Sequence, residues 1–215
     1  MEVTLLRHGE SLANAGLSDE LDSALTAKGE RQADLAGRWL EAEAQRVGPL
    51  TRALVSPFRR TLQTFQPTSV LTGVEAEIFP EICEYFCAHD TRYLSFAGLD
   101  RNQISEIVSS IDTEQPHTVW PRWWPGELED TYAVRARAAR VKANIIARFV
   151  DDDCRILLVS HAETIGRLAE AFMNVTPTDD VPWTENCGIW RFKVTDGGQR
   201  TETLLQNWQG HLKEV

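Results

Sequence analysis

The stretch TLLRHGESLAN, residues 4–14, joins the end of an apolar segment to a cluster of polar side chains. Residues 2–7 have the short, largely apolar pattern of a buried strand, and Arg7 and His8 stand where that strand ends. A surface loop that merely begins with polar residues would explain this pattern. The other explanation is that the exit of the strand is an anion-binding site with His8 at its centre.

The composition is that of one globular domain. The chain has 215 residues, of which 42% are hydrophobic and 25% charged, so we expect a single α/β domain over residues 1–215. Its net charge of -10 argues against general binding to nucleic acid or to an anionic membrane. No run of about 18 apolar residues is present to span a bilayer. Residues 1–7 lack the features of a signal peptide, so we expect a cytoplasmic protein that keeps its four cysteines as thiols.

Predicted strands and helices alternate along the chain. Thr26 is a good N-cap for an amphipathic helix over residues 27–46, and Pro57 suits the first position of the helix that follows. Apolar residues that step by three or four predict another helix between Val134 and Phe149. The other expected elements are strands at 52–56, 155–160, 187–194 and 202–208, a strand or extended edge at 76–80, and helices near 100–111 and 163–173.

This order of elements predicts a three-layer α/β/α fold with a mostly parallel central sheet. The segment RILLVS at 155–160 is nearly all apolar, which is typical of a strand buried on both faces. Ligands of such sheets bind beyond the carboxyl ends of the strands. The polar clusters at 7–9, 56–60 and 160–163 should therefore meet at one edge, where two histidines and two or three arginines suggest a phosphate site.

A long connection at about 85–130 is predicted to be an excursion over the edge of the sheet that forms a lid. Its tract VWPRWWPGELED contains Trp120, Trp123 and Trp124. These rings either lie over the site, where they would favour a bulky or apolar leaving group, or bury against the sheet. Arg122 between them either meets an anionic substrate or stands exposed at the rim.

Four motifs occur in a fixed order along the chain: LLRHGES at 5–11, LTAKGERQA at 25–33, SPFRRTLQT at 56–64 and VSHAET at 159–164. With the order of strands and helices, they resemble the histidine phosphatase superfamily, which includes the cofactor-dependent phosphoglycerate mutases and many small phosphatases. The resemblance covers nearly the whole chain. It implies a phosphoglycerate mutase-like fold and phosphoryl transfer through a phosphohistidine.

The resemblance implies a catalytic role for each matching residue. His8 would be the nucleophile, neutral and held in one tautomer by a backbone carbonyl at its other nitrogen. Arg7, Arg60 and His161 would hold the three phosphoryl oxygens, where the charge of the transition state lies. Arg59 is expected at the surface, or else near the distal end of the substrate.

Three further phosphate contacts are implied. Gly9 would let the backbone approach the ligand, because a Cβ there would intrude. Asn14 matches a phosphate-binding asparagine of the family or is a plain loop residue, and Ala162 stands where many relatives have glycine. Asn186 is expected to be a turn residue only.

A leaving alkoxide needs a proton. The resemblance places the acid within FPEICEYF, residues 79–86, best at Glu84 and alternatively at Glu81, with Glu163 as a third candidate. An apolar wall and a dianionic phosphate should raise the pKa of this glutamate, which keeps it protonated near neutrality.

The segment after the acid separates the possible activities. Phosphoglycerate mutases place basic residues there, whereas YFCAHDTRYLSFAG at 85–98 offers only His89 and Arg92. We therefore expect a phosphatase that acts on a small-molecule phosphomonoester without a metal or another cofactor. The alternatives are phosphoglycerate mutase-type transfer and a non-catalytic module that binds a phosphorylated ligand. The physiological substrate and the oligomeric state stay open.

Overall fold

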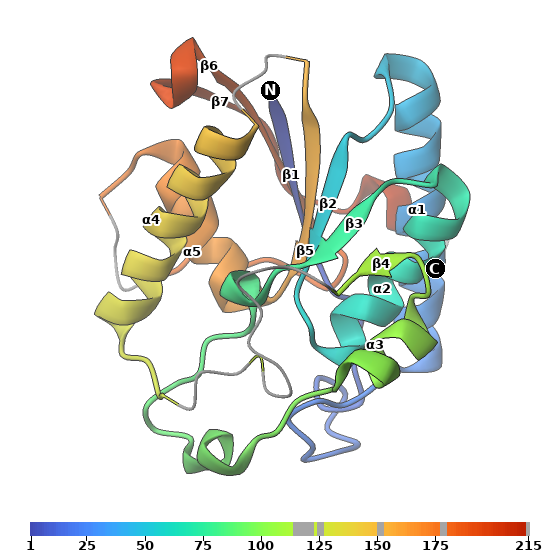
Figure 1. Ribbon diagram of the computed structural model, residues 1–215, viewed down its shortest axis with the longest axis vertical. Coiled ribbons are helices and arrows are strands. Elements are labelled where there is room, and N and C mark those ends of the chain that lie inside the picture. The colour runs from blue at the N-terminus through green and yellow to red at the C-terminus, as the bar shows by residue number, and fades with distance from the viewer. Residues whose placement is uncertain (114–122, 124–126, 150–152, 177–179, 214–215) are drawn as a thin grey trace.

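A seven-stranded sheet runs through the centre of the computed structural model, which describes residues 1–113, 123, 127–149, 153–176 and 180–213 (Figure 1). The strand order is β4-β3-β2-β5-β1-β6-β7. The first five strands in this order are parallel, as predicted for a mostly parallel sheet, while β6 runs antiparallel to β1 and β7 runs antiparallel to β6. The strands are β1 (Glu2–Arg7), β2 (Arg52–Val55), β3 (Ala76–Ile78), β4 (Ile111–Asp112), β5 (Arg155–Ser160), β6 (Ile189–Thr195) and β7 (Arg200–Trp208).

Helices cover both faces of the sheet, which confirms the three-layer fold. In Figure 1 α4 and α5 lie on one side of the strands, while α1, α2 and α3 lie on the other. The helices are α1 (Ala27–Val47), α2 (Arg59–Thr72), α3 (Arg101–Ile107), α4 (Thr131–Arg148) and α5 (Ala162–Met173). Short 3₁₀ turns are η1 (Pro80–Ile82), η2 (Thr91–Ser95), η3 (Asp196–Gly198) and η4 (Gly210–Leu212). None of the helices in the described part of the chain is both long and apolar enough to cross a membrane.

Two apolar cores follow from the alternation of side chains along the strands. On β5, Leu157 packs into the core beneath α1 and α2, while its neighbour Leu158 packs into the core beneath α4 and α5. Leu6 and Leu5 divide in the same way on β1. Every residue of β5 is buried, which confirms that this strand is covered on both faces. The four cysteines are free thiols, as expected.

The helix starts agree with the sequence at Thr26 and differ at Pro57. The side chain of Thr26 accepts a hydrogen bond from the Gly29 N–H at 3.0 Å and caps α1 as predicted. The prediction that Pro57 begins the next helix is wrong, because Phe58 still has extended backbone angles and α2 begins at Arg59. The missing side-chain cap comes from a distant loop, in which Asp22 accepts from the backbone N–H of Arg59 at 2.6 Å.

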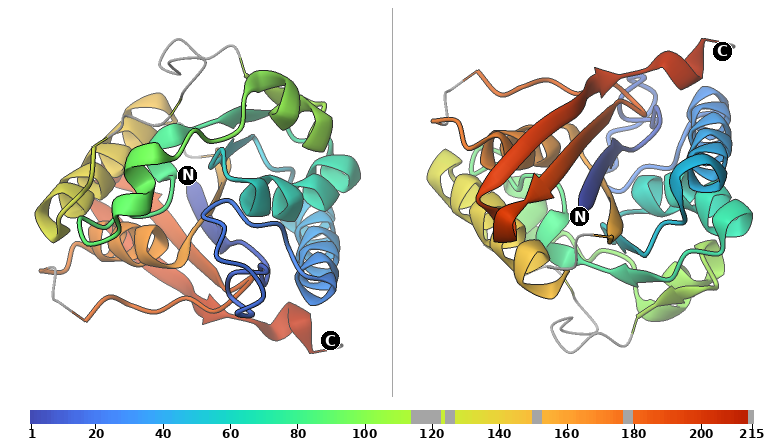
Figure 2. Two further views of the ribbon diagram at one scale, coloured as in Figure 1. Left: turned by 90° about the horizontal axis from the view of Figure 1, so that it is seen from below. Right: turned by 90° about the horizontal axis from the view of Figure 1, so that it is seen from above.

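The connection between β3 and α4 crosses the edge of the sheet at which the parallel strands end. Its residues 85–99 run across the bottom of Figure 1 and face the viewer in the left view of Figure 2. The ring of Trp123 is buried and packs edge-on against Phe58, with ring centroids 5.3 Å apart. The predictions for Trp120, Trp124 and Arg122 lie outside the described residues.

Candidate active site

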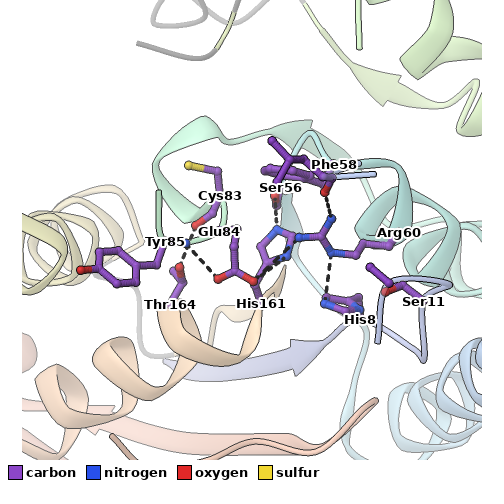
Figure 3. A network of polar contacts seen from close by, with 12 residues as sticks. His8, Ser11, Ser56, Phe58, Arg60, Cys83, Glu84, Tyr85, His161 and Thr164 are labelled. Carbon is purple, nitrogen blue, oxygen red and sulfur yellow. Dashed lines mark hydrogen bonds and ion pairs between the residues drawn. The ribbon is translucent and has the colours of Figure 1, made fainter. Parts of the chain in front are cut away.

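The carboxyl ends of three strands bring the predicted polar clusters together. In the sheet Arg7 of β1 is in register with Ser160 of β5, and Val55 of β2 is in register with Val159 of β5. The residues that directly follow these strands therefore share one edge, as the sequence predicted. Figure 3 shows His8, Arg60, Glu84 and His161 pointing toward one another at this edge, although they come from four separate segments.

His8 is fully buried and has a different partner at each ring nitrogen. Its Nδ1 lies 2.7 Å from the carbonyl oxygen of Gly9, which can only accept, so Nδ1 is the nitrogen that carries the proton. The Nε of Arg60 donates to Nε2 of His8 at 3.2 Å. Burial, together with the positive charges of Arg60 and Arg7, holds the pKa of His8 well below its usual value. The ring is therefore neutral, with a lone pair on Nε2 that faces the arginines.

His161 lies beside His8 and is also fully buried. The two ring centroids are 5.3 Å apart. The Nε2 of His161 contacts the hydroxyl of Ser56 at 2.8 Å, and its Nδ1 has no hydrogen-bond partner among the described residues. Burial and the charge of Arg60 hold the pKa of His161 well below its usual value. Because buried polar atoms are normally hydrogen-bonded, Nδ1 of His161 is suited to contact a bound ligand.

Two buried guanidinium groups flank the histidines. Arg7 donates to the carbonyl oxygen of Thr184 at 2.7 Å, and its Nε has no partner among the described residues. Besides His8, Arg60 donates to the carbonyl oxygen of Leu21 at 2.8 Å. Burial lowers the pKa of both arginines, but the usual value is so high that both stay charged.

Of the three candidate acids, only Glu84 faces the histidines. Its Oε2 lies 3.7 Å from Nδ1 of His161 and 3.8 Å from a terminal nitrogen of Arg60. Burial raises the pKa of the Glu84 carboxyl, and the charge of Arg60 opposes this shift without cancelling it. The other two candidates pair with arginines elsewhere, Glu81 with Arg140 at 4.0 Å and Glu163 with Arg167 at 3.1 Å.

The segment that carries Glu84 is fastened by Arg137, which sequence reasoning missed. Arg137 is a buried residue of α4 that donates to the carbonyl oxygens of Glu81 at 2.8 Å and Cys83 at 3.1 Å. Two more of its nitrogens donate to the two carboxylate oxygens of Glu129, each at 2.7 Å. The hydroxyl of Thr164 adds a bond to the carbonyl of Cys83 at 2.7 Å. The backbone next to Glu84 is therefore held from two helices.

Gly9 has a steric role that sequence reasoning did not predict. A Cβ on Gly9 would lie 2.5 Å from the carbonyl oxygen of Gly29, and a Cβ on Gly29 would lie 2.0 Å from the carbonyl oxygen of Glu10. The two glycines let the first turn of α1 touch the backbone that follows His8. The described contact that requires Gly9 is therefore with a helix, and the contact of Gly9 with a phosphate stays a prediction.

Asn14 and Asn186 meet across the site. Asn186 donates to the side-chain oxygen of Asn14 at 3.1 Å and to the carbonyl oxygen of His8 at 3.2 Å. Asn186 is thus more than the turn residue expected, and no pattern in the sequence signals this role. Ala162 is the first residue of α5, directly after His161, so the positive end of that helix lies at the site. The half-buried Arg59 is not among the residues that line the cavity described next.

An open cavity of about 280 Å³ leads to this group of residues. It is lined by Arg7, His8, Ser11, Ala13, Asn14, Ser18, Asp19, Glu20, Leu21, Arg60, Glu84, Arg92 and Tyr93. His8, Glu84 and His161 offer ligand atoms within 4.8 Å of one another, as a metal site would. However, the guanidinium groups of Arg7 and Arg60 face the same space and would repel a cation. The arrangement suits an anion that approaches Nε2 of His8.

Comparisons with known proteins agree with this geometry. The model of the histidine phosphatase superfamily (branch 1) matches residues 3–207. A curated relative, the probable phosphoglycerate mutase GpmB of Salmonella arizonae, is 27% identical over 97% of this chain and 90% of the relative.

Two solved structures share the fold. The ecdysone phosphate phosphatase of Bombix mori, in complex with tungstate, has a TM-score of 0.75 at 15% identity and covers 97% of this chain and 93% of its own. A mycobacterial glucosyl-3-phosphoglycerate phosphatase has a TM-score of 0.67 at 21% identity and covers 97% of this chain and 99% of its own. Because the family model spans nearly all of the sequence and the fold agrees, this chain belongs to the histidine phosphatase superfamily.

Proposed function

We propose that the protein is a phosphatase that hydrolyses a phosphomonoester through a phosphohistidine on His8 and needs no metal for this reaction. One observation carries the proposal. The carbonyl oxygen of Gly9 and the Nε of Arg60 fix His8 as a neutral ring with its lone pair on Nε2, and His8 lines a cavity together with two buried arginines. A neutral imidazole nitrogen beside paired guanidinium groups is suited to attack a bound phosphoryl group.

In the first step the Arg60 N–H turns from Nε2 of His8 to a phosphoryl oxygen, which frees the lone pair of Nε2. Nε2 then attacks phosphorus, and the bond from phosphorus to the ester oxygen breaks. Arg7, Arg60 and His161 hold the phosphoryl oxygens, on which the charge resides. Glu84 gives its proton to the leaving alkoxide, and burial, which raises the pKa of its carboxyl, favours the protonated form that this step needs. The phosphorylated ring is an imidazolium, and its Nδ1–H donates to the Gly9 carbonyl, which stabilises that charge.

In the second step a water molecule replaces the alcohol. Glu84, now a carboxylate, takes one proton from this water as its oxygen attacks phosphorus. The bond between phosphorus and Nε2 breaks, which returns His8 to its neutral form and releases phosphate. The proton on Glu84 then restores the starting state. Glu84 takes part in both steps, because it acts as the acid in the first half of the reaction and as the base in the second.

Metal independence is proposed on the charge of the site. Arg7 and Arg60 supply two buried positive charges. The attraction of each to a negative phosphoryl oxygen is stronger there than in water. Their two positive charges balance the two negative charges of a phosphoryl dianion, so a divalent cation is not needed to neutralise the phosphate. Activity in the presence of a chelator would support this point.

Phosphoglycerate mutase activity is the second candidate, and the name of the GpmB relative is the observation that favours it. It would require a place for the carboxylate of the substrate. Conversion of 3-phosphoglycerate to 2-phosphoglycerate in the presence of 2,3-bisphosphoglycerate would reveal this activity. Binding of phosphate with no turnover of any monoester would instead favour the non-catalytic module.

The test is release of phosphate from p-nitrophenyl phosphate in a chelator, by the natural chain and by His8→Ala. We expect hydrolysis by the natural chain and none above background by His8→Ala. Acid quenching during turnover of a ³²P-labelled ester should trap an acid-labile phosphoenzyme. His89→Ala, an exposed histidine outside the cavity, is the matched control and should keep full activity. Hydrolysis that survives His8→Ala, or that depends on added metal, would contradict the mechanism.

A further inference from the structure

The charges along the cavity are divided between its floor and its mouth. Buried Arg7 and Arg60 line the floor next to His8. The mouth is lined by Asn14, Ser18, Asp19, Glu20, Leu21, Arg92 and Tyr93, which come from the loop after β1 and from the segment around η2. A phosphomonoester would place its phosphoryl group on the floor and its leaving group in the mouth. The mouth therefore decides which leaving groups bind.

Arg92, the cation in the mouth, already forms hydrogen bonds with other groups of the protein. The Nε of Arg92 donates to Asp90 at 2.9 Å, and one terminal nitrogen donates to the same carboxylate at 2.6 Å. The other terminal nitrogen donates to the backbone carbonyl of Asp19 at 3.0 Å. Arg92 thus bridges the two walls of the mouth, and its charge is balanced by Asp90. All three of its nitrogens already donate to protein oxygens, so no pair of them is free to bind a second acidic group of the substrate.

Two further carboxylates, those of Asp19 and Glu20, lie at the mouth. Asp19 and Glu20 are exposed, and neither carboxylate forms an ion pair with any residue in the described ranges. Among the cavity-lining residues that the structure describes, Arg92 is the only cation outside the floor. Arg92 is the one cation set against the carboxylates of Asp90, Asp19 and Glu20 here, so three negative charges and one positive charge leave the mouth with a net charge of minus two. A leaving group with a carboxylate would be repelled there.

The positive charges on the floor do not offset this repulsion. A phosphoryl dianion balances the charges of Arg7 and Arg60, so neither arginine is left for another anion. We propose that the substrate is a phosphomonoester of a neutral or cationic alcohol, such as a polyol or an amino alcohol, and that it bears no second acidic group. This inference rests on the proposed function and names the substrate class of the same site.

Two pairs of phosphomonoesters that differ by a carboxylate test the inference. sn-Glycerol 3-phosphate and 3-phosphoglycerate share a three-carbon skeleton, and phosphoethanolamine and phosphoserine differ only by the carboxylate. Each compound is used as a competitive inhibitor of p-nitrophenyl phosphate hydrolysis at neutral pH and low salt, so that turnover of the compound is not needed. In both pairs we expect the member without the carboxylate to bind about fivefold more tightly, the size of repulsion that two charges exert on a third roughly 8 Å away in water.

Substitution at the mouth should reduce this discrimination. In Asp19→Asn/Glu20→Gln the ratio of the two inhibition constants should fall to within about twofold of unity, as it should for the natural chain in about 1 M salt. Glu106→Gln/Glu202→Gln removes the same charge from exposed positions on α3 and β7 outside this cavity and should keep the ratio.

The outcomes separate this inference from the proposed function. Equal or tighter binding of 3-phosphoglycerate and phosphoserine, or no inhibition by any of the four compounds, would overturn the substrate class while hydrolysis of p-nitrophenyl phosphate still stood. A ratio that the mouth substitution leaves unchanged would overturn it too. Loss of p-nitrophenyl phosphate hydrolysis in the natural chain, or its survival in His8→Ala, would instead reject the proposed function itself.

Discussion

The Nε of Arg60 donates to Nε2 of His8 at 3.2 Å, although 52 residues separate the two in the sequence. The same guanidinium donates to the carbonyl of Leu21, so its plane is fixed from both sides. This contact orients the ring, keeps a proton off Nε2 and places a positive charge next to the atom proposed to attack phosphorus.

Arg60→Lys should therefore lose activity with little loss of fold. Arg60 contacts His8 and Leu21 through two different nitrogens of its planar guanidinium, and a lysine retains the charge but replaces this fork with a single ammonium group. We expect kcat/KM for p-nitrophenyl phosphate to fall by about 100-fold, as for the loss of one preorganised donor. Arg59→Lys, at the adjacent position outside the cavity, is the control and should stay within about twofold of the natural chain, because a surface substitution changes little. Equal losses in the two variants would argue against the orienting contact.

Glu84→Gln should affect substrates according to their leaving group. An alkoxide needs a proton in the transition state, whereas nitrophenolate leaves without one, so kcat/KM should fall by about 10²- to 10³-fold for an alkyl phosphate and far less for p-nitrophenyl phosphate. Glu81→Gln and Glu163→Gln should change neither rate much, since these side chains pair with arginines elsewhere. Equal loss on both kinds of substrate in Glu84→Gln would assign the proton to another group.

The pH dependence of kcat/KM follows from the directions of two pKa shifts. The lowered pKa of His8 keeps the nucleophile neutral below the usual histidine value of about 6.5, so activity should persist as the pH falls through this value. The raised pKa of Glu84 keeps the acid protonated above the usual value of about 4.3, and activity on an alkyl phosphate should fall as the pH rises through the raised pKa.

The alkaline limb of this profile is the part that identifies Glu84. In the natural chain this limb should be weak when the substrate is p-nitrophenyl phosphate. In Glu84→Gln it should be absent even when the substrate is an alkyl phosphate. Rates measured across the pH range with both substrates, in the natural chain and in this variant, check the assignment. An alkaline limb that persists in Glu84→Gln would belong to a different residue.

Arg137→Met should both destabilise the protein and misplace the acid. Removing the guanidinium takes the ion-pair partner from the Glu129 carboxylate and the donor from the Glu81 carbonyl, while the Cys83 carbonyl keeps its bond from Thr164. We expect a cost of about 3 kcal/mol in the free energy of unfolding. Among properly folded molecules, kcat on an alkyl phosphate should fall more than kcat on p-nitrophenyl phosphate, because Glu84 has lost its support. Arg140→Lys, one turn along the same helix and exposed, is the control. Equal loss on the two substrates would mean a structural role only.

Gly29→Ala should destabilise the protein although alanine is the better helix former. Propensity alone predicts a gain of about 1 kcal/mol for this change within α1. The new Cβ would lie 2.0 Å from the carbonyl oxygen of Glu10, so the helix must move away from the loop that carries His8. We expect a net loss of about 2 kcal/mol in chemical denaturation. A gain in stability would contradict the close contact.

Much of the fold could be predicted from the sequence because its signals are local. The apolar run at 155–160 predicted a strand buried on both faces, and the cap at Thr26 predicted the start of α1. Pro57 misled, because the helix start there depends on a carboxylate from a distant loop, Asp22, and not on the proline. A local pattern gives the period of an element but not its partners, and it gives the ends only where the capping group is also local.

The sequence by itself determined the type of sheet and the residues at its carboxyl edge. The ends of the strands can be read from the apolar runs, and the carboxyl ends of parallel strands lie at the same edge of the sheet. Only the tertiary structure decided that Glu84 and not Glu81 or Glu163 faces the histidines. Only there does Arg137 reach Cys83, 54 residues away, and Asn186 reach His8, 178 residues away. Such contacts form because packing the two cores against the sheet brings distant segments together, and no spacing along the chain records them.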